Sequence, residues 1–218
     1  MWIINDKSYD IILTMILDKI LMLGIFSGIL QFIGYCVYAY DVSRDAVKPN
    51  PASWLIWSYG NILICLSYIF LVNNSLTFAA EILPIVCSIT CVVMAIYFMF
   101  IGKFRPLISF EKKIIFFDIL LTLIWVSSEF IGFNILPTAV IHILLLLGAA
   151  VTFIPIYKEV FDDPSVEHPR AWFIWFFAYV VLFAVVFTEG GSFDALLYPA
   201  LYSVLHVIVG ILAYKKLL

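Results

Sequence analysis

Two segments of the chain place aromatic and amide side chains at helical spacing, where they could bind a solute. Positions i, i+4 and i+8 are Trp57, Asn61 and Cys65 in the first segment and Trp175, Tyr179 and Phe183 in the second. Residues four apart share one helix face. Aromatic rings beside an amide are typical walls for a ring-bearing, hydrogen-bonding solute. We therefore predict a solute-binding site from Trp57, Asn61, Trp175 and Tyr179.

An alternative role for the tryptophans is structural. Trp54 and Trp57, like Trp172 and Trp175, lie close to one end of long apolar runs. Tryptophan is enriched at membrane interfaces, where it forms an aromatic belt. At 100° per residue, Trp54 points about 60° away from the Trp57 face, so we expect it to contribute less to a solute site.

Three further polar side chains fall inside apolar runs, and they are Gln31, His142 and His206. Such groups face the protein interior or a water-filled cavity when they lie within a membrane. Ser203 adjoins His206, so we add both to the predicted substrate-binding residues. The alternative is a neutral histidine bonded to a carbonyl or hydroxyl of a neighbouring helix.

The sequence offers no sign of an enzyme. It has no His-Glu-x-x-His, no Gly-x-Ser-x-Gly, no phosphate-binding glycine loop and no lysine in the middle of an apolar run. Its four cysteines lie in apolar runs without metal-ligand spacing, and we interpret them as small buried hydrophobes. We predict no catalytic residue, no metal site and no cofactor.

The elements that carry these residues are predicted to be membrane helices. Of the 218 residues, 65% are hydrophobic and 12% are charged, whereas soluble domains are about half apolar and a quarter charged. The apolar runs are about twenty residues long, as a helical span requires. We predict an all-α integral membrane protein with seven transmembrane helices at 19–40, 53–72, 77–101, 114–132, 136–157, 171–188 and 195–214. Residues 9–18 either lengthen the first span or form an interfacial helix.

The basic residues predict an orientation. Ten of the twelve fall on one side of this arrangement, and these are Arg44, Lys48, Lys103, Arg105, Lys112, Lys113, Lys158, Arg170, Lys215 and Lys216. Only Lys7 and Lys19 fall on the other side. The positive-inside rule places the ten in the cytoplasm, so we expect the N-terminus outside and the C-terminus inside.

An internal repeat divides the chain. The segment 51–57, Pro-Ala-Ser-Trp-Leu-Ile-Trp, recurs at 169–175 as Pro-Arg-Ala-Trp-Phe-Ile-Trp, which is an offset of 169 − 51 = 118. Pro84 and Ser88 pair with Pro199 and Ser203 at an offset of 115. An offset that covers three helices predicts a parallel repeat with its axis along the membrane normal.

The repeat sets the predicted organisation as two parallel three-helix repeats joined by a linker helix (3+1+3). Residues 1–101 form the N-terminal three-helix repeat, 102–135 contain linker helix 4, and 136–218 form the C-terminal three-helix repeat. Pro84, Pro155 and Pro199 lie in these spans and are predicted hinges, because proline frees a backbone carbonyl.

This architecture resembles the SWEET and PQ-loop transporters. The segment 153–156, Phe-Ile-Pro-Ile, stands where that superfamily carries its Pro-Gln pair, with Ile156 in place of the glutamine. The first repeat has Val37 at the corresponding place. The asparagine of sugar-carrying members falls at Pro84 and Pro199, so the sugar site does not transfer. The resemblance implies a 1-3-2 order of helices within each repeat.

A local motif is similar to another branch with this fold. Trp54-x-x-Trp57-x-x-x-Asn61 looks like the Trp-x-x-Trp-x-x-x-Asn signature of the PnuC vitamin transporters, which carry nicotinamide riboside. That family has the signature in its sixth span, whereas here it lies in the second. The sixth span of this chain has Tyr179 in place of the asparagine.

These observations predict a small-solute transporter or facilitator that works by alternating access. The expected solute is neutral and hydrogen-bonding: a nucleoside-like vitamin, a sugar or an amino acid. The alternatives are a seven-helix receptor or sorting protein on the same scaffold, and a scaffold without a solute. The expected partners are the solute, membrane lipids and a second copy in a homo-oligomer, with no nucleic acid. We expect a bacterial-type inner (plasma) membrane.

Overall fold

The computed structural model describes residues 6–49, 51–72, 76–102, 107, 109–130 and 136–214. Within these ranges the chain forms seven α-helices, two short 3₁₀ turns and no strand. The α-helices are α1 (Asp6–Ser43), α2 (Pro51–Val72), α3 (Ile82–Phe100), α4 (Ser109–Phe130), α5 (Thr138–Asp162), α6 (Pro169–Thr188) and α7 (Phe193–Tyr214). The turns are η1 (Phe78–Ala80) and η2 (Pro164–Val166).

Six of these helices are long and apolar enough to cross a membrane, counted over the described residues. The exception is α4, which is 22 residues long but carries Glu111, Lys112, Lys113 and Asp118. The protein is therefore an all-helical chain with the character of an integral membrane protein. A seventh span at 114–132 stays a prediction, and residues 131 and 132 lie outside the described residues.

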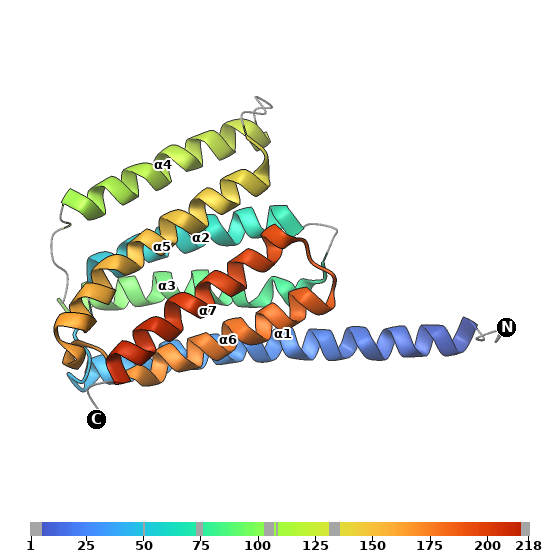
Figure 1. Cartoon of the computed structure of the whole chain (residues 1–218), viewed down its shortest axis with the longest axis horizontal. Helices are drawn as coiled ribbons and strands as arrows, with labels where there is room; N and C mark the ends of the chain where they lie inside the picture. Colours follow the sequence, from blue (N-terminus) through green and yellow to red (C-terminus); the bar gives the residue numbers. More distant parts are fainter. Residues whose placement is uncertain are drawn as a thin grey trace.

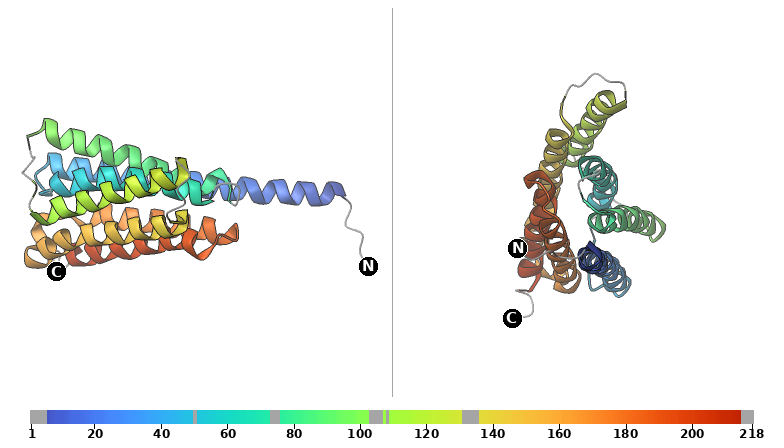
Figure 2. Two further views of the ribbon diagram at one scale, coloured as in Figure 1. Left: turned by 90° about the horizontal axis from the view of Figure 1, so that it is seen from above. Right: turned by 90° about the vertical axis from the view of Figure 1, so that its right-hand side faces the viewer.

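All seven helices run along one axis (Figure 1). Figure 2 shows α1, α2 and α3 on one side of the bundle and α5, α6 and α7 on the other. Within the first group, α3 packs against both α1 and α2, and within the second, α7 packs against both α5 and α6. Contacts of α1 with α6 and of α2 with α5 join the groups, while α4 lies at the edge against α5 and α2.

One end of the bundle holds the C-terminal ends of α1, α3, α5 and α7 (Figure 1). We call it the basic end, because Arg44, Lys48, Lys158 and Arg170 lie in or beside the helix ends there. Lys103, Arg105, Lys215 and Lys216 lie outside the described residues. Residues 9–18 belong to a single helix with the rest of α1, which extends beyond the other helices at the opposite end (Figure 1).

Glycines let α1 approach its neighbours closely. A Cβ added at Gly24 would lie 2.5 Å from the carbonyl oxygen of Ala79, and one at Gly34 would lie 2.3 Å from Nε1 of Trp175. Both distances are shorter than van der Waals contact. Since small residues allow close packing of membrane helices, these two positions fix how α1 sits against η1 and α6.

The predicted hinges occupy different helical environments. Pro155 and Pro199 lie in the interior of α5 and α7, where each removes a backbone hydrogen bond. Pro84 is the third residue of α3, in the first turn, where N–H groups have no partner in their own helix. The physical reason for a hinge therefore applies to Pro155 and Pro199 and not to Pro84.

Candidate functional site

The four tryptophans of the repeated segments are buried in the protein. The exposed fraction is 2% for Trp54, 9% for Trp57, 1% for Trp172 and 2% for Trp175. A belt tryptophan presents its ring to the lipid interface, so this interpretation is wrong for all four. Their rings pack against one another: Trp54 lies 5.4 Å from Trp57, and Trp172 lies 5.2 Å from Trp175, between ring centroids.

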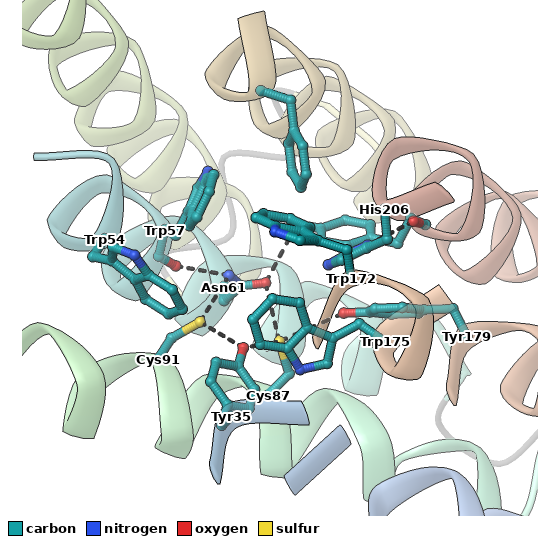
Figure 3. Close-up of a pocket in the computed structure, with 12 residues that line it drawn as sticks. Tyr35, Trp54, Trp57, Asn61, Cys87, Cys91, Trp172, Trp175, Tyr179 and His206 are labelled. Carbon is teal, nitrogen blue, oxygen red and sulfur yellow. Dashed lines mark hydrogen bonds between the residues drawn. The ribbon is translucent and has the colours of Figure 1, made fainter. Parts of the chain in front are cut away.

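These rings surround a cavity between the two groups of helices (Figure 3). The cavity is lined by Tyr35, Trp54, Trp57, Asn61, Cys87, Cys91, Phe153, Trp172, Trp175, Tyr179, Tyr202 and His206. Among the described residues that line it, none is an acid, a lysine or an arginine. The free volume is about 20 Å³, which holds about one water molecule. A larger solute would therefore have to separate the walls.

Asn61 is the amide at the centre of this cavity (Figure 3). Its Nδ2 donates to the carbonyl oxygen of Trp57 at 2.9 Å and to Sγ of Cys91 at 3.4 Å. Its Oδ1 accepts from the hydroxyl of Tyr202 at 3.3 Å. The side chain is thus held by α2, α3 and α7 together, and a solute that hydrogen-bonds to it would replace one of these weak partners.

Sulfur and hydroxyl groups extend the polar side of the cavity. The hydroxyl of Tyr35 lies 2.9 Å from Sγ of Cys91 and 3.3 Å from Sγ of Cys87. The hydroxyl of Tyr179 donates to Sγ of Cys87 at 3.5 Å. Cys65, Cys87 and Cys91 are buried, as the sequence predicts, whereas Cys36 is exposed, so the prediction is wrong for Cys36. Cys87 and Cys91 also line the cavity.

The two buried histidines have separate environments. His206 lines the cavity, and its Nδ1 lies 2.7 Å from the carbonyl oxygen of Tyr202 on its own helix. His142 lies outside the cavity, where its Nδ1 is 2.9 Å from the hydroxyl of Ser67. His142 therefore bonds to a hydroxyl of a neighbouring helix, as the alternative for a neutral histidine predicts, whereas His206 bonds to a carbonyl of its own helix.

Aromatic side chains close the cavity toward both ends. Toward the basic end lie Tyr38, Trp54, Phe98 and Trp172, with Tyr38 5.0 Å from Trp54 and 6.3 Å from Trp172 between centroids. We call these four residues the basic-end layer. Toward the other end, Tyr68 lies 5.2 Å from Tyr198, and His142 lies 5.7 Å from Tyr68. Because the rings in both layers are buried, the cavity is closed on both sides.

Polar contacts join α6 and the residues beside its two ends to the first group of helices and the residues beside them. At the basic end Arg170 forms an ion pair with Asp41 of α1, which is 1% exposed. The hydroxyl of Tyr38 donates to Oε1 of Glu167 at 2.9 Å, and Nε1 of Trp172 donates to Oε2 at 2.9 Å. At the opposite end the hydroxyl of Thr77 bonds to Glu189.

Five of the six predicted site residues line one cavity, and these are Trp57, Asn61, Trp175, Tyr179 and His206. Ser203 does not line it, and its hydroxyl donates to the carbonyl oxygen of Pro199 at 2.7 Å. Trp54 lines the cavity although its helical angle predicts otherwise. A large aromatic ring reaches well beyond the direction of its Cβ, so an offset of about 60° does not remove it from the face.

Sequence reasoning did not assign Tyr35, Phe153 and Tyr202 to the site. Tyr202 carried a signal, because it adjoins the predicted Ser203 and lies four positions before His206. Tyr35 and Phe153 sit among many aromatic residues in apolar runs, and no spacing marks them.

No protein-family model, curated protein or solved structure matches this chain.

Proposed function

We propose that this protein is a small-solute transporter or facilitator that works by alternating access. The observation that carries the proposal is the closed aromatic cavity around Asn61, which lies between two groups of three helices. A path between two such groups, with the solute site midway, is typical of transporters built from repeats. In this proposal the present conformation is occluded, and opening either aromatic layer admits the solute.

The arrangement of helices supports a 3+1+3 architecture. In the first group α3 packs between α1 and α2, and in the second α7 packs between α5 and α6, so both groups use the same order. The cavity receives Trp54 and Trp57 from one group and Trp172 and Trp175 from the other. In this proposal α4 is the linker, the two groups are parallel repeats, and the basic end faces the cytoplasm.

The chemistry of the lining supports a neutral, flat and hydrogen-bonding solute. Aromatic rings stack on a planar solute, and each ring contributes about 1–3 kcal/mol, as in base stacking. Asn61 supplies both a donor and an acceptor. A receptor for a charged peptide terminus needs an opposite charge in its cavity, and the lining residues carry none. The chemistry of the lining therefore favours nucleosides over sugars and amino acids, once the walls separate to admit them.

Screening for thermal stabilisation tests this proposal. A solute that binds the folded protein raises its melting temperature in proportion to the logarithm of its concentration. We expect a nucleoside to stabilise the purified protein and to enter liposomes that contain it. The proposal fails if nucleosides, sugars and amino acids neither stabilise the protein nor cross the membrane of such liposomes faster than that of empty ones.

A further inference from the structure

Asp118 is a buried carboxyl near the aromatic cavity. It lies in the middle of α4 and is 4% exposed. It lines a second, smaller cavity together with Ile56, Trp57, Gly60, Asn61, Leu145, Ala149, Thr152 and Tyr202. Three of these residues, Trp57, Asn61 and Tyr202, also line the aromatic cavity, so the two cavities share a wall.

Two glycines make room for this carboxyl. A Cβ added at Gly148 of α5 would lie 3.4 Å from Oδ1 of Asp118, and one at Gly60 of α2 would lie 3.7 Å from Oδ2. The helices on both sides thus present bare backbone to the two oxygens. Within the described residues neither oxygen has a hydrogen bond or an ion pair, and only the backbone carbonyl of Asp118 accepts one, from Thr122 at 2.7 Å.

The described residues that surround this carboxyl include no charge that would neutralise its ionised form. The groups that face the same cavity are the amide of Asn61 from α2, the hydroxyl of Thr152 from α5 and the hydroxyl of Tyr202 from α7. On α4 itself the described charged residues nearest along the helix are Lys113 and Lys112, more than one turn away, and Glu111 is two turns away. An isolated carboxylate buried in this way is strongly unfavourable unless it binds a cation.

We propose that Asp118 is a proton-binding site and that its carboxyl is protonated in this closed conformation. The cavity favours a proton over a metal ion. Its free volume is about 10 Å³, whereas hard metal cations collect several oxygen ligands. The hydroxyl of Thr152 already donates to the carbonyl oxygen of Ala149 at 2.6 Å and accepts from Nε1 of Trp57 at 2.7 Å.

The shared wall gives this site a role in the proposed transport. Water that enters between α4, α2 and α5 stabilises the carboxylate, so the proton leaves when the helices separate. The two cavities share the side chains of Trp57, Asn61 and Tyr202. A movement of these side chains that admits the solute would therefore also change the surroundings of Asp118. This coupling depends on the proposed function, whereas binding of the proton does not, and the following experiment measures the proton alone.

Infrared spectroscopy detects a protonated carboxyl by its C=O stretching band, which shifts in heavy water. The neutral carboxyl of Glu167 gives a band of its own, which cancels in the difference between wild-type and variant spectra. At mildly acidic pH we expect this difference to show one carboxyl band for Asp118→Asn and none for Asp162→Asn, at an exposed acid. An identical band in wild type and Asp118→Asn would overturn the proposal. So would loss of the band when sodium chloride replaces potassium chloride, since sodium would then occupy the site.

The variant also carries its own folding test. Asparagine has nearly the shape of a neutral aspartic acid, so Asp118→Asn should fold and melt at or above the wild-type temperature. Failure of this variant to fold would contradict a neutral carboxyl. Titration of the band in the unmodified protein gives a second measurement, and we expect it to disappear at a higher pH than the band of an exposed carboxyl.

Discussion

The hydroxyl of Tyr202 donates to Oδ1 of Asn61 at 3.3 Å, and this bond joins α7 to α2 across the centre of the cavity. The two residues are 141 positions apart in the chain. The long distance indicates a weak hydrogen bond. A solute donor can therefore displace the hydroxyl of Tyr202 at little cost in free energy. Asn61 would then hydrogen-bond to the solute, so that changing Asn61 should change the affinity for the solute.

Asn61→Ala is predicted to weaken solute binding about tenfold or more, because a lost hydrogen bond costs about 1 kcal/mol and more when a buried partner remains. Binding of the stabilising solute is measured by calorimetry. Ser203→Ala is the matched control, because this buried hydroxyl bonds only within its own helix. Unchanged affinity in a folded Asn61→Ala protein would exclude Asn61 from the site.

Gly34→Ala is predicted to disrupt the cavity, because the added methyl lies against Trp175, which lines it. The added methyl would lie 2.3 Å from Nε1 of Trp175, so the indole must shift and lose its bond to the carbonyl oxygen of Gln31 at 3.2 Å. Overpacking of this kind costs about 1–3 kcal/mol. We expect a lower melting temperature and a changed tryptophan fluorescence.

Gly24→Ala is the control for this prediction, since its methyl meets the backbone of Ala79 far from the cavity. It should lower the melting temperature and leave solute affinity unchanged. If Gly34→Ala binds solute as well as Gly24→Ala does, Trp175 is not needed in the wall.

The basic end is predicted to face the cytoplasm. Ten of twelve basic residues belong to that side in the sequence, and the positive-inside rule sets orientation by such residues. A reporter that is active only in the cytoplasm, fused after Leu218, should therefore be active. An inactive reporter on a well-expressed fusion would reverse the orientation, and a fusion before Met1 should give the opposite result.

The sequence predicts the helices well because their cause is local. Apolar runs of about twenty residues form membrane helices whatever their neighbours are, and the predicted spans match α2, α6 and α7 to within two residues at each end. The site residues Trp57, Asn61, Trp175 and Tyr179 were also predictable, because the repeated motif and the helical period place them on matching faces.

Other features depend on contacts between distant residues and leave no local pattern. Tyr35 lines the cavity because glycines bring α1 close to α6, and a sequence alone does not pair these helices. Asp118 is buried because Gly60 and Gly148, on two other helices, enclose its carboxyl, and no local pattern indicates this. Ser203 has the right helical phase, but its hydroxyl bonds to its own backbone.

The last prediction concerns Glu167, which lies between α5 and α6 outside the membrane-spanning segments and is 2% exposed. Burial raises the pKa of this carboxyl from its ordinary value of 4.5 to about 8. The donors Trp172 and Tyr38 lower the pKa, while the charges of Glu159 and Asp41 raise it further. The folded protein therefore holds Glu167 in its neutral form at neutral pH.

The sign of the pH effect follows from this raised pKa. The neutral carboxyl contributes its full stability below pH 4.5, and the contribution is lost as pH rises toward about 8. Between these values one proton changes the free energy of unfolding by up to about 1.4 kcal/mol per pH unit. Glu167→Gln should remove this part of the slope, because its amide can accept from Trp172 and donate to the hydroxyl of Tyr38.

Unfolding by a denaturing detergent across this pH range measures the effect. Asp118 contributes equally to both proteins, so the difference between wild type and Glu167→Gln isolates Glu167. Asp162→Asn is the control, since its carboxyl is exposed and should leave the wild-type slope unchanged. Equal slopes for wild type and Glu167→Gln would show that Glu167 is already ionised. A smaller slope in the variant would show that Glu167 takes up a proton when the protein folds and Tyr38 and Trp172 come to donate to it.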